Sequence, residues 1–244
     1  MKMISNVSHH VHKGFAAVWR SLFPPYCMCC KGRLLGNEQY VCSSCMLQLP
    51  RPSLGEDAYD NAFVRRFWGT LPIGGGVAVF SYFPGGELVH VIHGMKYYNK
   101  PDVCRFMGRM MAYDPLVKQL LEDAEILIPV PITSARRSQR GYNQSELMCE
   151  GISSIAGTEL VTDSLQRISF EESQTALEHT ERADNIRNAF ELGNTERIEG
   201  RHVVIVDDIV TTGATMLECA MVLSKVPGIK ISILALAWTS GHWR

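Results

Sequence analysis

Two adjacent acids followed by a Thr/Gly-rich turn form the most informative part of the chain. Residues 203–215 read Val-Val-Ile-Val-Asp-Asp-Ile-Val-Thr-Thr-Gly-Ala-Thr. The four β-branched residues that open this run are typical of a parallel strand buried on both faces. Apolar residues then recur at helical spacing after Gly213. A strand, a tight turn and a helix N-terminus together favour a phosphate site, because free N–H groups and the positive end of the helix dipole converge there.

The side chains of the turn and of the acid pair fit a phosphorylated sugar. The turn that would hold the phosphate consists of Thr211, Thr212, Gly213, Ala214 and Thr215. Glycine lets the backbone approach closely, and the threonine hydroxyls add donors. Asp207 and Asp208 come where ligands of open α/β sheets bind, and we expect them to face sugar hydroxyls and a hydrated Mg²⁺. The alternative is an ordinary strand–turn–helix whose acids only cap the helix.

A group of cations precedes a predicted helix elsewhere in the chain. After a strand that ends in Pro-Val-Pro, a predicted loop carries Arg136, Arg137 and Arg140. Guanidinium forks match phosphate oxygens bidentately, so this loop suits a pyrophosphate, although a solvated basic turn is the simpler alternative. Lys96, near the end of another predicted helix, is either a further phosphate-facing cation or a plain C-terminal helix charge.

Five of the eight cysteines cluster near the N-terminus. Cys27/Cys30 and Cys42/Cys45 form two Cys-x-x-Cys pairs, a spacing that favours a closed, structural four-sulfur Zn²⁺ site. Redox or disulfide use and unliganded thiols remain the alternatives. Cys29 is ambiguous, because adjacent cysteines do not ligate one metal easily and Cys27 has the better spacing.

Composition narrows the class of protein. The 244 residues have a formal net charge of −1, so no global basic field indicates nucleic-acid or membrane binding. No apolar stretch is long enough for a membrane span, and Arg20 interrupts the only candidate signal region. We therefore expect a cytoplasmic protein.

The order of predicted elements indicates an α/β fold with a mostly parallel sheet. We expect an N-terminal helix (11–23) and a zinc-ribbon segment within 1–50, a linker over 51–76, and an α/β domain over 77–244. In that domain, strands are predicted at 77–83, 125–130, 159–165 and 230–238, besides the strand of the acid pair. Helices are predicted at 87–97, 102–121 (with a break near Pro115), from about Asn143, and at 213–225. Residues 169–183 are polar and aperiodic, which indicates a mobile loop.

The acid pair and its turn resemble the phosphoribosyl pyrophosphate (PRPP) motif of type I phosphoribosyltransferases. Over nearly the whole chain, the order of motifs resembles the ComF family of competence-associated phosphoribosyltransferase-like proteins. The matching features are the N-terminal helix ending in Pro24, the cysteine ribbon, Met95-Lys96-Tyr97, Pro129-Val130-Pro131, Arg136 and Arg140 before Gly141-Tyr142-Asn143-Gln144, Gln174, Arg182-Ala183-Asp184-Asn185, Phe190 and the 203–215 run.

This resemblance implies a type I phosphoribosyltransferase fold and a division of labour among the site residues. The 211–215 turn would hold the 5′-phosphate, and Asp207 and Asp208 would bind the ribose 2′- and 3′-hydroxyls. Arg136, Arg140 and Lys96, with Mg²⁺, would neutralise the departing pyrophosphate. The acceptor is unknown, and a homodimer is compatible with such a chain.

Three functions remain open at this point. The first is a phosphoribosyltransferase with an unknown nitrogen acceptor. The second is a non-catalytic accessory protein in DNA uptake or recombination that acts through competence or DNA-processing partners. The third is a zinc-ribbon nucleic-acid binder, which the two ribbon cations Lys31 and Arg33 support only thinly, so direct nucleic-acid binding is not expected.

Overall fold

The computed structural model describes residues 24–97, 100–168 and 189–239. The chain divides into two compact units, Met1–Leu49 and Pro50–Arg244. The predicted helix over 11–23 and the predicted loop over 169–183 lie outside the described residues. Within the described part of the chain, no helix combines the length and the apolar character that crossing a bilayer requires.

The smaller unit is held by short-range structure around its cysteines. Within its described residues, 24–49, it contains the helix α2 (Ser43–Gln48), which begins after Cys42. Two isolated antiparallel bridges join Tyr26 to Arg33 and Gln39 to Val41. The turn between the first bridged residues carries Lys31 at a positive φ of 61°.

The larger unit alternates strands and helices. In chain order its elements are η1 (Val64–Phe67), β1 (Ile73–Ser81), α3 (Leu88–Tyr97), α4 (Pro101–Ala112), α5 (Pro115–Glu122), β2 (Ile126–Pro129), α6 (Ser134–Arg140), α7 (Gln144–Ala156), β3 (Glu159–Leu160), β4 (Leu165–Arg167), β5 (Phe190–Leu192), β6 (His202–Val210), α8 (Ala214–Leu223) and β7 (Lys230–Trp238).

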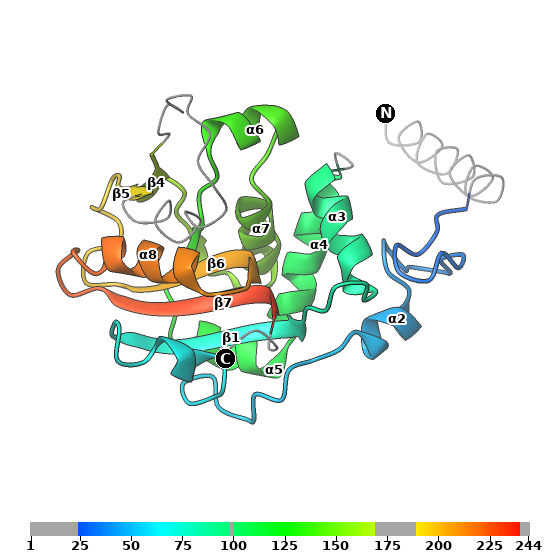
Figure 1. Cartoon of the computed structure of the whole chain (residues 1–244), viewed down its shortest axis with the longest axis horizontal. Coiled ribbons are helices and arrows are strands. Elements are labelled where there is room, and N and C mark those ends of the chain that lie inside the picture. The colour runs from blue at the N-terminus through cyan, green and yellow to red at the C-terminus, as the bar shows by residue number, and fades with distance from the viewer. Residues whose placement is uncertain (1–23, 98–99, 169–188, 240–244) are drawn as a thin grey trace, which may run out of the picture. The chain divides into compact units, whose positions relative to one another are not determined.

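Five of the strands form one sheet in the order β1-β7-β6-β2-β3, and every neighbouring pair in it is parallel (Figure 1). The central strands β6 and β7 are almost wholly buried, which explains their nearly continuous β-branched and apolar sequences. The strands β4 and β5 form a separate antiparallel hairpin. The predicted α/β fold with a mostly parallel sheet is confirmed.

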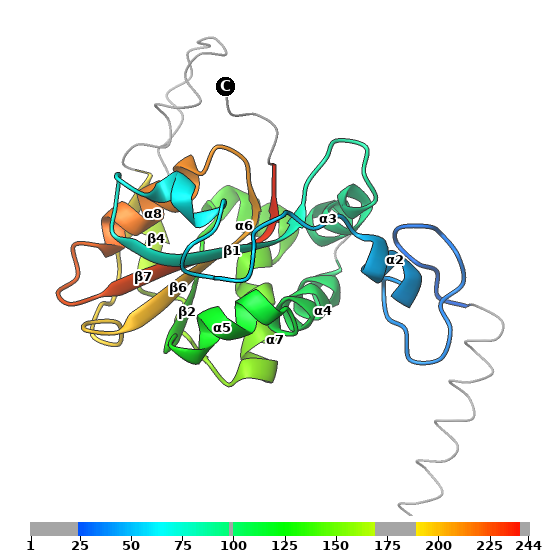
Figure 2. The same cartoon turned by 90° about the horizontal axis from the view of Figure 1, so that it is seen from below.

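Helices cover both faces of the sheet. The helix α8 lies on one face, and α4, α5 and α7 lie on the other (Figure 2). The helices α4 and α7 touch backbone to backbone, because a Cβ atom at Gly108 would overlap the carbonyl oxygen of Met148. One at Gly151 would in the same way overlap the carbonyl oxygen of Arg105. Two glycines therefore set how closely these helices pack.

The segment 51–76, expected as a linker, belongs to the larger unit. Asn61 is buried and its amide donates to the carbonyl of Gly76 (2.8 Å), while its oxygen accepts the N–H groups of Phe63 and Val64. These hydrogen bonds hold the start of the short helix η1, in which Phe67 is buried. The strand β1 begins at Ile73, earlier than the predicted Val77. The Gly-rich residues before Val77 also pair with β7.

The predicted break near Pro115 is present, whereas the arginine segment differs from the prediction. The chain over 102–121 forms two helices. The first has Tyr113 as its C-cap, and Asp114 caps the second with its carboxylate, with Pro115 at the next position. The arginine loop is instead the helix α6, whose first turn is capped by the hydroxyl of Thr133 and which ends at Gly141 with φ 80°. Three closely spaced arginines gave no apolar periodicity from which a helix could be predicted.

Candidate functional site

The two acids lie inside β6, which continues past them to Val210. The carboxylate of Asp207 accepts hydrogen bonds from the Ser145 hydroxyl (3.1 Å) and from the N–H of Asp208 (2.8 Å). Burial, and then the negative charge of Asp208, raise the pKa of the Asp207 carboxyl to about 7. Asp207 is therefore poised to exchange a proton near neutral pH, which an ordinary surface aspartate does not do.

Asp208 is paired with a lysine from another element. Its side chain is buried, and its Oδ2 atom lies 2.7 Å from Nζ of Lys96, in the last turn of α3. The sequence left Lys96 as either a phosphate-facing cation or a helix-end charge. The structure gives it a third role, in which it neutralises one of the two acids.

A cavity of about 280 Å³ lies at the carboxyl ends of the strands and brings predicted residues together. Those that line it are Lys96, Arg136, Arg140, Asp207, Asp208 and Thr215. The other turn residues, Thr211, Thr212, Gly213 and Ala214, line an adjoining hollow together with Asp207 and Thr215. Acids, turn and arginines, which are up to 79 positions apart in sequence, thus surround one continuous region.

The turn has the backbone that a phosphate site needs. Gly213 is the N-cap of α8 and has a φ of 81°, a conformation that residues with side chains rarely adopt. The hydroxyl oxygen of Thr212 accepts the N–H of Ala214 (3.3 Å). A Cβ atom at Gly213 would come 2.9 Å from the ring of Phe67, so this aromatic ring packs directly behind the turn. The positive end of the α8 dipole faces whatever occupies the hollow.

The three arginines of α6 have different surroundings. Arg137 points to Glu146, with 3.0 Å between their charged atoms, and does not line the cavity. Arg140 donates to Gln144 (3.1 Å), and its guanidinium lies 5.7 Å from the ring centroid of Tyr97. Arg136 is exposed at the cavity edge. The two arginines chosen from the sequence are the two through which α6 lines the cavity.

Two further polar residues of the cavity, Ser145 and Arg167, were not singled out from the sequence, and Tyr97 was named only as part of a family motif. Ser145 follows Asn143, the N-cap of α7, and only the fold brings it beside Asp207. Arg167 ends β4, in a stretch too short to show a strand pattern. Tyr97 is 66% exposed. Its position next to Lys96 was the one feature of the sequence that could have indicated a place in the site. The motif residues Gln174, Arg182 and Asn185 lie outside the described residues, whereas Phe190 is buried in β5.

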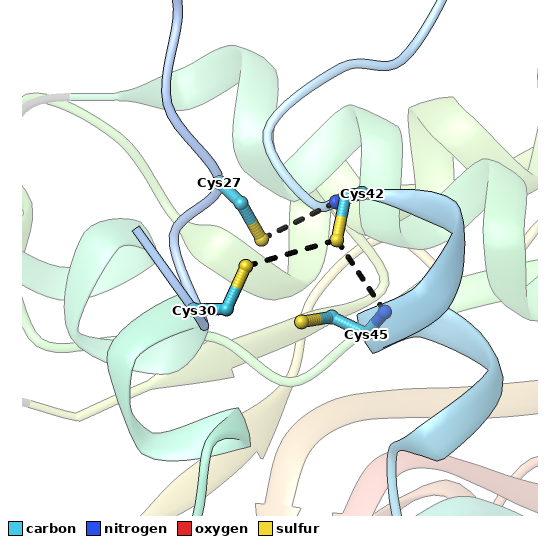
Figure 3. A group of neighbouring side chains, drawn as sticks. All are labelled: Cys27, Cys30, Cys42 and Cys45. Atoms are coloured by element: carbon cyan, nitrogen blue, oxygen red, sulfur yellow. Dashed lines mark hydrogen bonds between the residues drawn. The ribbon is translucent and has the colours of Figure 1, made fainter. Parts of the chain in front are cut away.

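The predicted cysteine cluster forms in the smaller unit. The sulfur atoms of Cys27, Cys30, Cys42 and Cys45 all lie within 4.8 Å of one another and point inward (Figure 3). Cys30 Sγ and Cys42 Sγ are 3.9 Å apart, and a tetrahedral zinc site with Zn–S bonds of about 2.3 Å would separate its sulfurs by about 3.8 Å. The donor set and spacing therefore fit Zn²⁺. Cys29 is not a member of this cluster.

Backbone N–H groups donate to three sulfurs of the cluster, while burial raises the pKa of the Cys45 thiol. Cys27 Sγ accepts the N–H of Cys42 (3.3 Å), Cys30 Sγ that of Gly32 (3.4 Å), and Cys42 Sγ that of Cys45 (3.5 Å). Burial opposes ionisation of Cys27, but the backbone donors outweigh it and lower the pKa of this thiol to about 7. Thiolate is the form that binds a metal.

Comparison with known proteins agrees with this geometry. Residues 115–241 match the family model of the phosphoribosyl transferase domain. The chain is 29% identical to the DNA utilization protein YhgH of Salmonella typhimurium over 67% of this chain and 71% of that protein. It is 26% identical to Competence protein F of Haemophilus influenzae over 86% of this chain and 96% of that protein. It is 31% identical to Competence protein ComFC of Bacillus subtilis over 37% and 35% of the two chains.

Proposed function

The chain belongs to the phosphoribosyl transferase domain family and, within it, to the ComF and YhgH proteins, and from this we propose that it binds PRPP with Mg²⁺ and transfers the phosphoribosyl group to a nitrogen acceptor. The single observation that carries the proposal is the cavity in which the acids, the arginines and Thr215 of the turn meet. Groups that suit a ribose and a pyrophosphate line this cavity, and the turn that suits the 5′-phosphate lines the adjoining hollow.

The proposed roles follow from charge and hydrogen-bonding capacity. The turn 211–215 at the start of α8 binds the 5′-phosphate. Asp207 and Asp208 accept hydrogen bonds from the ribose hydroxyls, and Arg136 and Arg140 hold the pyrophosphate. Mg²⁺, when bound, supplies additional positive charge to the phosphate oxygens. The nitrogen forms its bond to C1 while the C1–O bond breaks, the bonding electrons leave with pyrophosphate, and the nitrogen's proton goes to solvent.

Positioning and electrostatics account for the chemistry, and no covalent intermediate with the protein is needed. Asp207 tunes the site to pH, because its raised pKa leaves it partly protonated at neutral pH. The carboxylate has more acceptor capacity than the protonated acid, and it already accepts a hydrogen bond from Ser145. The ammonium of Lys96 compensates the charge of the second acid, Asp208.

We propose that the four-cysteine cluster holds a structural Zn²⁺. Four sulfur ligands leave no open coordination position, so the metal would fold the smaller unit without taking part in chemistry. The scarcity of regular structure between Tyr26 and Leu49 supports this role, since a metal can replace a hydrophobic core in so small a unit.

The test is binding followed by turnover. Calorimetry of the full chain with PRPP·Mg²⁺ should show binding that Asp207→Asn plus Asp208→Asn abolishes, with circular dichroism unchanged. The native chain should also exchange labelled pyrophosphate into PRPP in the presence of the right acceptor, or hydrolyse PRPP slowly without one. Native-like PRPP affinity in the double variant would refute the assignment of the two acids.

A second candidate function is a PRPP-binding accessory protein in DNA uptake. The roles in the names of its relatives, DNA utilization and competence, favour it. In that case the native chain should bind PRPP without any pyrophosphate exchange. DNA uptake can then be measured in a strain that carries the Asp207/Asp208 double variant. Normal uptake would show that the acids are dispensable for the physiological role. Failed uptake would show that the partners sense PRPP binding.

A further inference from the structure

Arg167 reaches the cavity from an element that carries none of the other proposed site residues. It is the last residue of β4 and faces Phe190 across the β4–β5 hairpin. Its guanidinium lies 5.1 Å from the ring centroid of Phe190, a contact that holds the side chain in place. From there it lines the same cavity as Arg136 and Arg140, which come from α6.

Ion pairing distinguishes these three arginines from six others. Six arginines that do not line this cavity form ion pairs with carboxylates: Arg51, Arg65, Arg105, Arg137, Arg197 and Arg201. Within residues 24–97, 100–168 and 189–239, no carboxylate forms an ion pair with Arg136, Arg140 or Arg167, although two carboxylates line the same cavity. Of those two, Asp208 is already neutralised by Lys96.

Positive charge is therefore concentrated in this cavity, and the charge of Asp207 offsets it only in part. Burial, and then the positive charge of Arg136, lower the pKa of Arg167, which means that the cation is held in an unfavourable place. Arginine stays protonated in proteins, so Arg167 cannot avoid this cost by losing its charge. An anion that enters between the guanidiniums relieves both costs at once, because it replaces lost solvation and screens the repulsion.

We propose that Arg167 is a binding residue for the pyrophosphoryl group, acting together with Arg136 and Arg140. This inference rests on the proposed function, because it takes PRPP as the ligand of the cavity. The pyrophosphoryl group is favoured over the 5′-phosphate for two reasons. The turn 211–215 is already assigned to the 5′-phosphate. In addition, Arg167 interacts electrostatically with Arg136, which is assigned to the pyrophosphate. Three guanidiniums without a carboxylate partner also match the high negative charge of a pyrophosphate.

The experiment compares three ligands and three variants by calorimetry of the full chain with Mg²⁺. Arg167→Gln should weaken binding of inorganic pyrophosphate and of PRPP by about 10- to 100-fold, as expected for a lost hydrogen-bonded charge, and should leave binding of ribose 5-phosphate unchanged. Arg167→Lys should recover part of the loss, since it keeps the charge but not the fork. Arg137→Gln is the matched control and should bind all three ligands as the native chain does, because Glu146 occupies its guanidinium.

Each other outcome has a definite meaning. Native-like pyrophosphate affinity in Arg167→Gln overturns the role of Arg167 and leaves the proposed function standing. The role of Arg167 is also overturned if Arg167→Gln loses affinity for ribose 5-phosphate as much as for pyrophosphate. The same holds if the variant is less thermally stable but binds pyrophosphate normally, because Arg167 would then support the fold. If the native chain binds pyrophosphate but not PRPP, the proposed function fails and Arg167 is still judged on pyrophosphate. Binding of neither ligand overturns both.

Discussion

Lys96 Nζ lies 2.7 Å from Asp208 Oδ2, so a lysine suited to a phosphate and an acid suited to a ribose are engaged with each other. An ammonium group has three N–H donors, and one of them is enough for Asp208. The remaining donors can meet a phosphate oxygen without breaking the pair. The ion pair is thus compatible with PRPP binding, but it makes Lys96 a residue with two tasks, of which compensating the charge of Asp208 is the one seen in the structure.

Replacing Lys96 by methionine should destabilise the protein. Asp208 would remain buried without a partner, which costs about 3 kcal/mol of unfolding free energy at pH 8. Adding Asp208→Asn to that variant should restore most of the loss, because no buried charge is then left at this position. Urea unfolding measures both, with Lys118→Met at an exposed position of α5 as the control. A single variant as stable as the native chain would mean that the pair contributes nothing to folding.

The affinity for PRPP·Mg²⁺ should rise between pH 6 and pH 8. The pKa of Asp207 is raised to about 7 in the folded chain, so the carboxylate that accepts ribose hydroxyls forms over this range. Phosphate groups themselves titrate near pH 6, so the measured quantity is the difference in slope between the native chain and Asp207→Asn. Equal slopes in calorimetry would show that Asp207 does not control the pH dependence.

Folding stability should respond to the same group with the opposite sign. An aspartate whose folded pKa lies above its unfolded value of about 3.9 binds more protons in the folded state. Its contribution is therefore most favourable below pH 4 and is lost as the pH rises towards 7. In unfolding experiments Asp207→Asn should gain stability relative to the native chain as the pH is raised through this window, and a constant difference would contradict the raised pKa.

Gly213→Ala should impair the phosphate turn more than a positive φ alone can explain. The new Cβ atom would meet the ring of Phe67 at 2.9 Å in addition to the backbone strain at φ 81°. The matched control is Gly157→Ala, at φ 75°, where the added methyl group would have no heavy atom within 4 Å. Both variants should lose about 1–2 kcal/mol of stability to strain, but only Gly213→Ala should also lose affinity for ribose 5-phosphate. Equal effects on binding would argue against the turn as the phosphate site.

Removing metal should expose the cysteine cluster alone. Metal analysis should find a single zinc ion per chain, and a chelator should make the four thiols of Cys27, Cys30, Cys42 and Cys45 reactive towards a thiol reagent. Cys104, Cys149 and Cys219 are buried in the larger unit and should stay unreactive. Thiols of the cluster that react equally fast before and after chelation would show that no metal is held there.

The sequence was most informative where one local pattern determines the structure. The strand of the acid pair, the helix after Gly213 and the last strand were predicted because buried parallel strands and amphipathic helices have distinct periodicities. The cysteine cluster followed from spacing alone. Choosing Arg136 and Arg140 over Arg137 required the motif resemblance, since nothing local shows that Glu146 would pair with Arg137.

The rest depended on contacts between distant parts of the chain. The hydrogen bond from Ser145 to Asp207 spans 62 residues, and the ion pair between Lys96 and Asp208 joins α3 to β6, which are far apart in chain order. Arg167 belongs to a strand of three residues, too short for a periodic pattern. In the segment 51–76, the side chain of Asn61 forms hydrogen bonds with the backbone of Phe63, Val64 and Gly76, contacts that no apolar periodicity announces.

The glycines at the crossing of α4 and α7 limit which substitutions the two helices can accept. Gly108 and Gly151 leave no room for even a methyl group between the two backbones. Ser145 stands at the start of α7, so the position of its hydroxyl beside Asp207 depends on that crossing distance. A larger residue at either glycine would lift the helix and carry the hydroxyl away from the acid. A substitution at this crossing would thus disturb the surroundings of Asp207 while every residue of the cavity stays unchanged.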